Sequence, residues 1–234
     1  MKRTFIILLA IIVACTHLMA QEKVKVALDA DFISHYVWRG QDMADVCVQP
    51  ALNISWRGLS LTAEGSVGLS NSDDAKEIDL TAQYTIGGLS FGIVDYWADD
   101  ADQRYFYYNS HETGHVFEGF VAYDFGILSA SWQTNFAGFD GYNKSGRRAY
   151  SSYAEVNVPF RLASLEWEAT AGVVPYATDY YGTNGFAVTN VSLKASKTIP
   201  VSKYLSLPLF AQIVANPCSG RAYFVFGITI SPNL

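Results

Sequence analysis

The residues best placed to do chemistry in this chain are acidic side chains that recur at every second position of alternating segments. Around residues 59–69, for example, Leu59 and Leu61 share one phase, while Thr62 and Glu64 share the other. Carboxylates gathered on one wet surface attract cations and repel anions. The positions that we predict to line this wet surface are Asp29, Asp31, Glu64, Glu77, Asp79, Glu118, Glu155, Glu166, Glu168 and Lys194.

Groups that could catalyse a reaction are sparse by comparison. General acid-base or nucleophilic catalysis needs a base held beside its partner, and the imidazoles after residue 20 are His35, His111 and His115. His111 and His115 are four residues apart, but outside any helical pattern, so we do not expect them to ligate a metal. We also find nothing like the His-Ser-Asn pattern of outer-membrane phospholipases. We therefore expect no enzyme and no cofactor; a lipid hydrolase that uses His35 is the weaker alternative.

The alternation that carries these residues predicts β-strands over almost the whole chain after residue 21. We count about twelve segments, from about 24–38 to about 222–231, separated by alternately tight and long connectors. Strands of this length cross a membrane when tilted, and an even number returns both termini to the periplasmic side. We therefore predict an all-β protein, an antiparallel up-and-down transmembrane β-barrel. Pro208 falls within the expected strand 205–216 and requires a later strand start or a bulge there.

The same alternation is compatible with a soluble, lipocalin-like barrel or sandwich in which the inner and outer faces are exchanged. Two features favour the membrane. Aromatic residues such as Tyr84 and Trp97 gather near both ends of the expected strands, as in interfacial girdles. The connectors also alternate in length, which a soluble barrel does not require.

The first residues predict export. Lys2 and Arg3 precede an apolar run that ends near a small residue, Ala20, so we assign residues 1–20 to a signal peptide and 21–234 to the barrel. The alternative is a lipoprotein signal, with Cys15 lipidated and kept. Cleavage after Ala20 leaves 14 basic against 22 acidic residues, a net charge of about −8, which makes nucleic acid a poor partner.

One motif resembles a known family. The segment Ser34-His35-Tyr36-Val37-Trp38-Arg39-Gly40, followed by Gln49-Pro50-Ala51-Leu52, is similar to the TorF-like (Gcw_chp) family of outer-membrane proteins. That family typically has Asp-Tyr-Val-Phe-Arg-Gly and then Pro-Ala-Val-Gln in this region, so His35 and Trp38 are departures, and Gln49 precedes the proline instead of following it. The match covers the N-terminal quarter of the chain. The resemblance implies an outer-membrane barrel and no particular activity.

Three loop features complete the sequence predictions. We expect Arg39 and Gly40 to end the first strand at the outer rim, near His35, with the arginine anchored to carboxylates or lipid phosphate. Cys47 and Cys218 fall in the first and last outer loops, which barrel closure makes neighbours, so we expect a disulfide; free thiols are the alternative. The aromatic run 105–108 either folds into the mouth, where it would stack on sugars or narrow the pore, or extends a strand.

Taken together, these features predict a small porin-like channel in the outer membrane. Membrane lipid surrounds it, and a small solute passes through an acidic, cation-favouring lumen. Two alternatives stay open. The lumen is filled by side chains whose carboxylates are paired, protonated or hydrated, or the barrel does not conduct and its outer loops bind a surface partner or a glycan.

Overall fold

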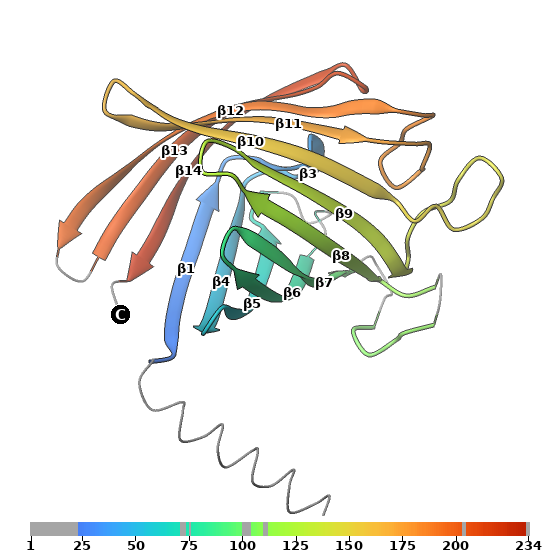
Figure 1. The fold of residues 1–234 in the computed structure, drawn as a ribbon, viewed down its shortest axis with the longest axis horizontal. Coiled ribbons are helices and arrows are strands. Elements are labelled where there is room, and N and C mark those ends of the chain that lie inside the picture. Colours follow the sequence, from blue (N-terminus) through green and yellow to red (C-terminus); the bar gives the residue numbers. More distant parts are fainter. Residues whose placement is uncertain are drawn as a thin grey trace, which may run out of the picture.

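The computed structural model describes residues 23–70, 74, 76–99, 104–109, 112–202 and 205–232, and these form a closed antiparallel barrel of twelve strands (Figure 1). The expected signal peptide and Cys15 lie outside the described residues. No helix long and apolar enough to span a membrane occurs in this part of the chain. The wall strands are β1 (Lys25–Ile33), β4 (Cys47–Trp56), β5 (Leu59–Gly68), β6 (Lys76–Ile86), β7 (Leu89–Asp99), β8 (His115–Asp124), β9 (Ser129–Gly138), β10 (Ser152–Leu162), β11 (Leu165–Val174), β12 (Ala187–Ser202), β13 (Leu205–Asn216) and β14 (Arg221–Pro232).

The barrel closes because β1 has a partner along both of its edges. Asp31, for example, is opposite Gln49 of β4 on one side and opposite Thr229 of β14 on the other. All other neighbours in the wall are consecutive in the sequence, which is the up-and-down arrangement. The start of β1 and the end of β14 lie at the same end of the barrel (Figure 1). The predicted antiparallel barrel of about twelve strands is thus confirmed.

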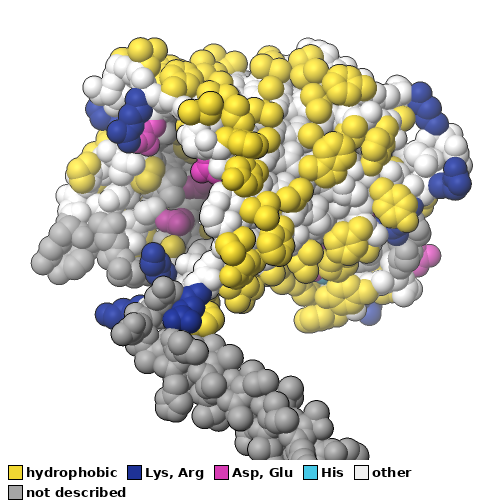
Figure 2. Space-filling view, viewed as in Figure 1, with side chains coloured by type: hydrophobic (Ala, Val, Ile, Leu, Met, Phe, Trp, Pro, Cys, Tyr) yellow, Lys and Arg dark blue, Asp and Glu magenta, His cyan; other side chains and the backbone are white. Residues whose placement is uncertain are grey.

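The outer face of the wall is apolar. Large hydrophobic side chains in one phase of each strand are open to the surroundings, among them Leu61, Leu80 and Ile93. Figure 2 shows hydrophobic side chains spread over the wall and several acidic side chains recessed in a hollow. A water-soluble barrel would turn the apolar phase inward, so this arrangement rules out the lipocalin-like alternative and suits a hydrocarbon environment.

The connectors differ at the two ends of the barrel. At one end, turns of two to four residues join neighbouring strands. Arg57 and Gly58 both have positive φ angles, of 48° and 83°, as a type I′ hairpin turn requires. The longer connectors, such as 139–151 and 175–186, lie at the opposite end. Pro208 lies inside β13, whose pairing with β14 covers Leu205 and Ser206 and resumes at Leu209. The ladder is therefore interrupted where proline has no N–H to donate.

The connector after β1 contains the main departure from the sequence prediction. The first strand ends at Ile33 rather than near Trp38, and a short hairpin follows, formed by β2 (Tyr36–Trp38) and β3 (Gln41–Ala44). Ser34 fixes the point of departure, because its N–H donates to Phe226 O and its Oγ accepts from Phe226 N–H. Arg39 and Gly40 form the tip, with φ angles of 51° and 80°.

Candidate functional site in the lumen

The tip of the β2–β3 hairpin crosses the lumen and is held on the opposite wall. Arg39 makes a bidentate ion pair with Glu118 of β8: Nη1 lies 2.6 Å from Oε2, and Nη2 lies 2.8 Å from Oε1. Only 11% of the Arg39 side chain and 1% of the Glu118 side chain are exposed. The prediction that Arg39 ends a strand at the outer rim is therefore wrong. Its partner is a carboxylate, as expected, but that carboxylate is inside the barrel.

Aromatic side chains surround the Arg39 guanidinium. Its Cζ lies 4.3 Å from the centre of the Trp38 ring and 4.9 Å from that of Tyr153, both within range for a cation–π interaction. Nη1 also donates to the hydroxyl of Tyr181, at 2.6 Å. Burial raises the pKa of Tyr181 to about 12, so this hydroxyl stays protonated at neutral pH. The guanidinium therefore contacts two aromatic rings and donates hydrogen bonds to Glu118 and Tyr181, and it is not free to bind an anionic solute.

Gly40 fits the tip against β12 and the end of β13. Asn216 Nδ2 donates to the carbonyl oxygen of Gly40 at 3.0 Å. A Cβ atom built on Gly40 would lie 1.8 Å from the carbonyl oxygen of Thr189 on β12, and the positive φ angle also disfavours a side chain. Glycine is therefore required here by backbone conformation and by close approach.

His35 lies at the base of the same hairpin rather than on the rim of the first strand. Its Nε2 is 2.8 Å from Asp42 Oδ1, without the alignment of a hydrogen bond, and its Nδ1 is 3.6 Å from Asp45 Oδ1. The ring stacks on Tyr223 of β14, with centroids 5.2 Å apart. These contacts give His35 a structural position at the point where the hairpin leaves the wall.

The wall facing the hairpin carries three carboxylates close together. Glu64 on β5 is directly opposite Asp79 on β6, and Glu77 is two residues before Asp79 on the same face. None of the three forms an ion pair with another described residue. Asp79 Oδ1 is buried and has no hydrogen-bond partner. Carboxylates directly opposite one another on paired strands repel when both are charged, and no basic side chain among the described residues forms an ion pair with this cluster.

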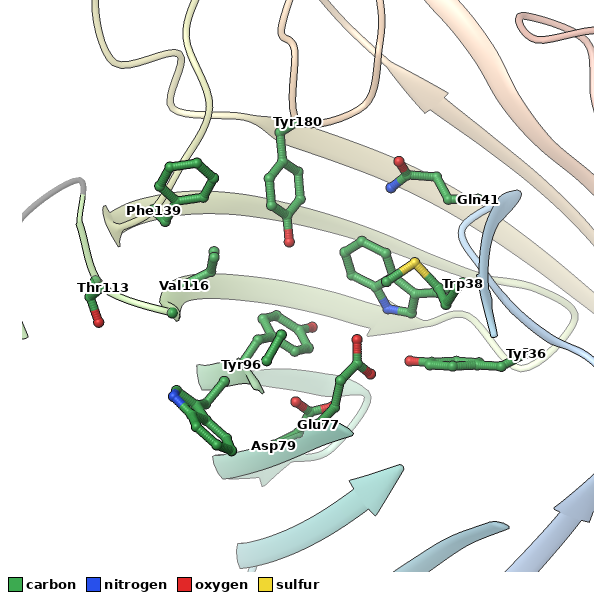
Figure 3. Close-up of a pocket in the computed structure, with 14 residues that line it drawn as sticks. Tyr36, Trp38, Gln41, Glu77, Asp79, Tyr96, Thr113, Val116, Phe139 and Tyr180 are labelled. Atoms are coloured by element: carbon green, nitrogen blue, oxygen red, sulfur yellow. The ribbon is translucent and has the colours of Figure 1, made fainter. Parts of the chain in front are cut away.

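A cavity of about 290 Å³ separates the hairpin from this acidic wall. Figure 3 shows how its walls are built: Trp38 and Gln41 come from the hairpin, and Glu77 and Asp79 come from β6. Tyr180, from the connector between β11 and β12, points its hydroxyl into the space. The remaining lining includes Tyr36, Met43, Tyr96, Val116 and Phe139. We call this space the hairpin cavity.

The ten residues predicted to line the lumen all lie in the inward phase of their strands, opposite the exposed apolar phase. Their roles differ. Glu118 binds Arg39, and Glu166 forms an exposed ion pair with Arg161 beside a tight turn. Asp29 accepts a hydrogen bond from Ser231, and Glu155 accepts one from Tyr153. Asp31 Oδ1 is buried without a hydrogen-bond partner, and Glu168 is opposite Lys194, whose Nζ lies 4.4 Å from the Phe210 ring centre.

A second polar cluster lies on the outward phase, near the long-loop end. His115 is fully buried there, with Nδ1 2.8 Å from Asp95 Oδ1 and Nε2 against the carbonyl oxygen of Tyr105. Tyr108 stacks on the His115 ring at 4.5 Å, so residues of the aromatic run cover this histidine and neither extend a strand nor enter the mouth.

His111 lies outside the described residues. No group of three or more His, Cys, Asp or Glu residues in the described ranges is arranged to hold a metal.

The structure does not contain the expected disulfide, because Cys47 and Cys218 are both free thiols. Cys47 begins β4 and is buried. Cys218 is exposed in the turn after β13, and its N–H donates to Val188 O of β12. Closing the barrel brings the two loops to the same end but not the two sulfur atoms together.

Comparison with known proteins agrees with the barrel geometry. Neither a family model nor a curated protein sequence matches the chain. Among solved structures, the NanC porin superposes with a TM-score of 0.50 over 90% of this chain and all of the porin, at 10% identity. The fold is that of an outer-membrane porin. The KdgM porin is similar over 89% of this chain and 99% of its own, with a TM-score of 0.46 and 9% identity. At these identities the likeness concerns the fold of this porin-like barrel and not its solute.

Proposed function

We propose that the protein is a passive outer-membrane channel for a small solute and that its lumen favours cations. The observation that carries the proposal is the unequal pairing of charge across the hairpin cavity. Arg39, on the hairpin, is neutralised by Glu118, whereas Glu64, Glu77 and Asp79 have no basic partner among the described residues. A permeating ion that passes the hairpin therefore meets an acidic wall.

The electrostatic preference follows from Coulomb's law. At about 4 Å, two unit charges interact by about 4 kcal/mol at an effective dielectric constant of about 20, and three neighbouring carboxylates act together. A cation in the hairpin cavity relieves the repulsion between Glu64 and Asp79, while an anion adds to it. The hairpin also narrows the passage, so we expect the channel to admit small solutes only.

The surroundings of the barrel support its placement in the outer membrane. Its exposed apolar face requires lipid, and its fold is shared with porins of that membrane. Export by a cleavable signal at residues 1–20 and membership of the TorF-like family are part of the same proposal. Membrane lipid is then the partner of the outer face, and the solute is the partner of the lumen.

Reversal potentials in planar bilayers test the cation preference. With a KCl gradient across the bilayer, the folded wild-type protein should show a reversal potential of the sign that cation selectivity gives. The triple variant Glu64→Gln, Glu77→Gln, Asp79→Asn should lose most of this potential. Glu166→Gln is the matched control, because it removes a carboxylate at the exposed turn end and should leave selectivity unchanged. An anion-selective or silent wild-type barrel would refute the proposal.

A further inference from the structure

We propose that the hairpin cavity binds a small organic amine in its protonated form, with the ammonium group at Glu77 and Asp79 and an apolar substituent among the aromatic rings. This inference rests on the proposed function, because it names the class of solute that would pass this point. It concerns an equilibrium binding site, however, and can be measured without any conduction.

The aromatic rings around the cavity form an incomplete cage. Trp38 contacts Tyr96 edge to face, with centroids 5.6 Å apart, and contacts Tyr180 in the same manner at 6.2 Å. The Tyr36 hydroxyl points toward Glu77 from the other side of the cavity (Figure 3). Aromatic faces attract ammonium groups, and the attraction increases when water is excluded. Rings alone would accept any apolar molecule; the carboxylates beside them select a positive one.

The carboxylates are suitably placed for one ammonium group. Glu77 and Asp79 both point into the same cavity from one strand (Figure 3), and Oδ1 of Asp79 is a buried acceptor without a donor. A buried acceptor that lacks a donor is costly, and an ammonium N–H would satisfy it. The nearest basic side chain on the hairpin, Arg39, is already bound to Glu118 and cannot take this place.

The rest of the lining argues against other solutes. Met43, Val116 and Phe139 add apolar surface to the lining beside the polar groups of the cavity. A sugar with hydroxyl groups on all sides would bury some of them against this apolar surface. A bare metal ion prefers several oxygen ligands around it, and no group of three or more His, Cys, Asp or Glu side chains among the described residues is arranged to hold one. A volume of about 290 Å³ is at the small end for ligand pockets, so the occupant is a compact molecule with one charged end.

Calorimetric titration of the folded full barrel in detergent tests the inference with two probes of nearly equal shape. Benzylamine, which is protonated at pH 7, should bind at least about tenfold more tightly than neutral benzyl alcohol. Asp79→Asn and Glu77→Gln keep the shape of the cavity and should each abolish this preference. Glu166→Gln should retain it. Equal affinity for the two probes, unchanged affinity in both cavity variants, or tighter binding of glucose than of benzylamine would overturn the inference.

The binding test and the conduction test fail separately. If benzylamine binds to a barrel that shows no cation selectivity, the amine site stands and the channel proposal fails. If the barrel is cation-selective but does not distinguish benzylamine from benzyl alcohol, the channel stands and the amine site is wrong. Loss of signal through misfolding is recognised by circular dichroism, since a folded variant keeps the β-sheet spectrum of the wild type.

Discussion

Substitution of Arg39 by alanine should release the hairpin from the far wall and widen the channel. The guanidinium links the tip to Glu118 through two hydrogen bonds and to Tyr181 through a third. Removal of Arg39 leaves Glu118, which is 1% exposed, with Tyr96 as its remaining side-chain donor among the described residues, 3.1 Å away. A buried carboxylate that has lost its counter-charge is stabilised by water. Water can reach Glu118 only if the hairpin tip moves away, so the substitution favours the released hairpin.

The size of the effect follows from the burial of the pair. Breaking a buried ion pair from one side costs about 3–5 kcal/mol, whereas an exposed pair contributes about 0–1 kcal/mol. Since about 1.4 kcal/mol corresponds to a factor of ten, the equilibrium between docked and released hairpin should shift by roughly a hundredfold or more in Arg39→Ala. Arg161→Ala is the control, because Arg161 is 84% exposed and its ion-pair partner Glu166 is 64% exposed. Loss of this exposed ion pair should shift the equilibrium between docked and released hairpin by no more than a fewfold.

Single-channel recording measures this shift directly. Arg39→Ala should show a larger conductance step, or a much higher occupancy of a large step that is rare in the wild type. The double variant Arg39→Ala, Glu118→Gln removes the orphaned charge as well, so it should regain part of the lost stability while the hairpin stays released. If folded Arg39→Ala has the conductance and open probability of the wild type, the ion pair does not hold the hairpin and the reasoning is wrong.

Further predictions concern the tip, the acidic wall and the thiols. Gly40→Ala should release the hairpin as Arg39 removal does, because its Cβ would overlap a backbone oxygen; an unchanged conductance would contradict this. Asp79→Asn should stabilise the empty barrel by about 0.2–1 kcal/mol, because it removes the repulsion between this carboxylate and Glu64 on the neighbouring strand. The thermal unfolding midpoint, measured by heat-dependent electrophoresis, should therefore rise, and a lower midpoint would count against the prediction. Maleimide should label Cys218 in the folded barrel and Cys47 only after denaturation, and equal labelling before denaturation would disprove the placement.

The wall of the barrel could be predicted from sequence because its physics is local. Each strand separates an apolar face from a polar face with a period of two, so residues such as Leu61 and Glu64 reveal their directions without any knowledge of the neighbouring strand. Turn length is also local, and it placed the tight connectors at one end. The strand register is not needed to predict that Glu64 and Asp79 face the lumen. Only the structure shows that the two residues are directly opposite one another.

The hairpin could not be predicted in the same way, because its aromatic residues continue the phase of β1. Tyr36 and Trp38 have the parity of Phe32, so periodicity alone extends the first strand past the point where the chain turns inward. A local signal was present: a residue followed by glycine, Arg39-Gly40, between short alternating segments is typical of a type I′ hairpin. The partners of Arg39 carry no such signal, because Glu118 and Tyr181 are 79 and 142 residues away.

These separations have a consequence for assembly. The hairpin is synthesised near the start of the barrel, yet its tip is held by residues of β8, the β11–β12 connector and the last residue of β13. Contacts so distant in sequence form only when the intervening strands have been placed, which makes docking of the tip a late event. A chain that lacks its C-terminal strands would therefore leave the hairpin tip undocked. The hairpin narrows the lumen only once the barrel is finished, and its docking marks the completion of folding.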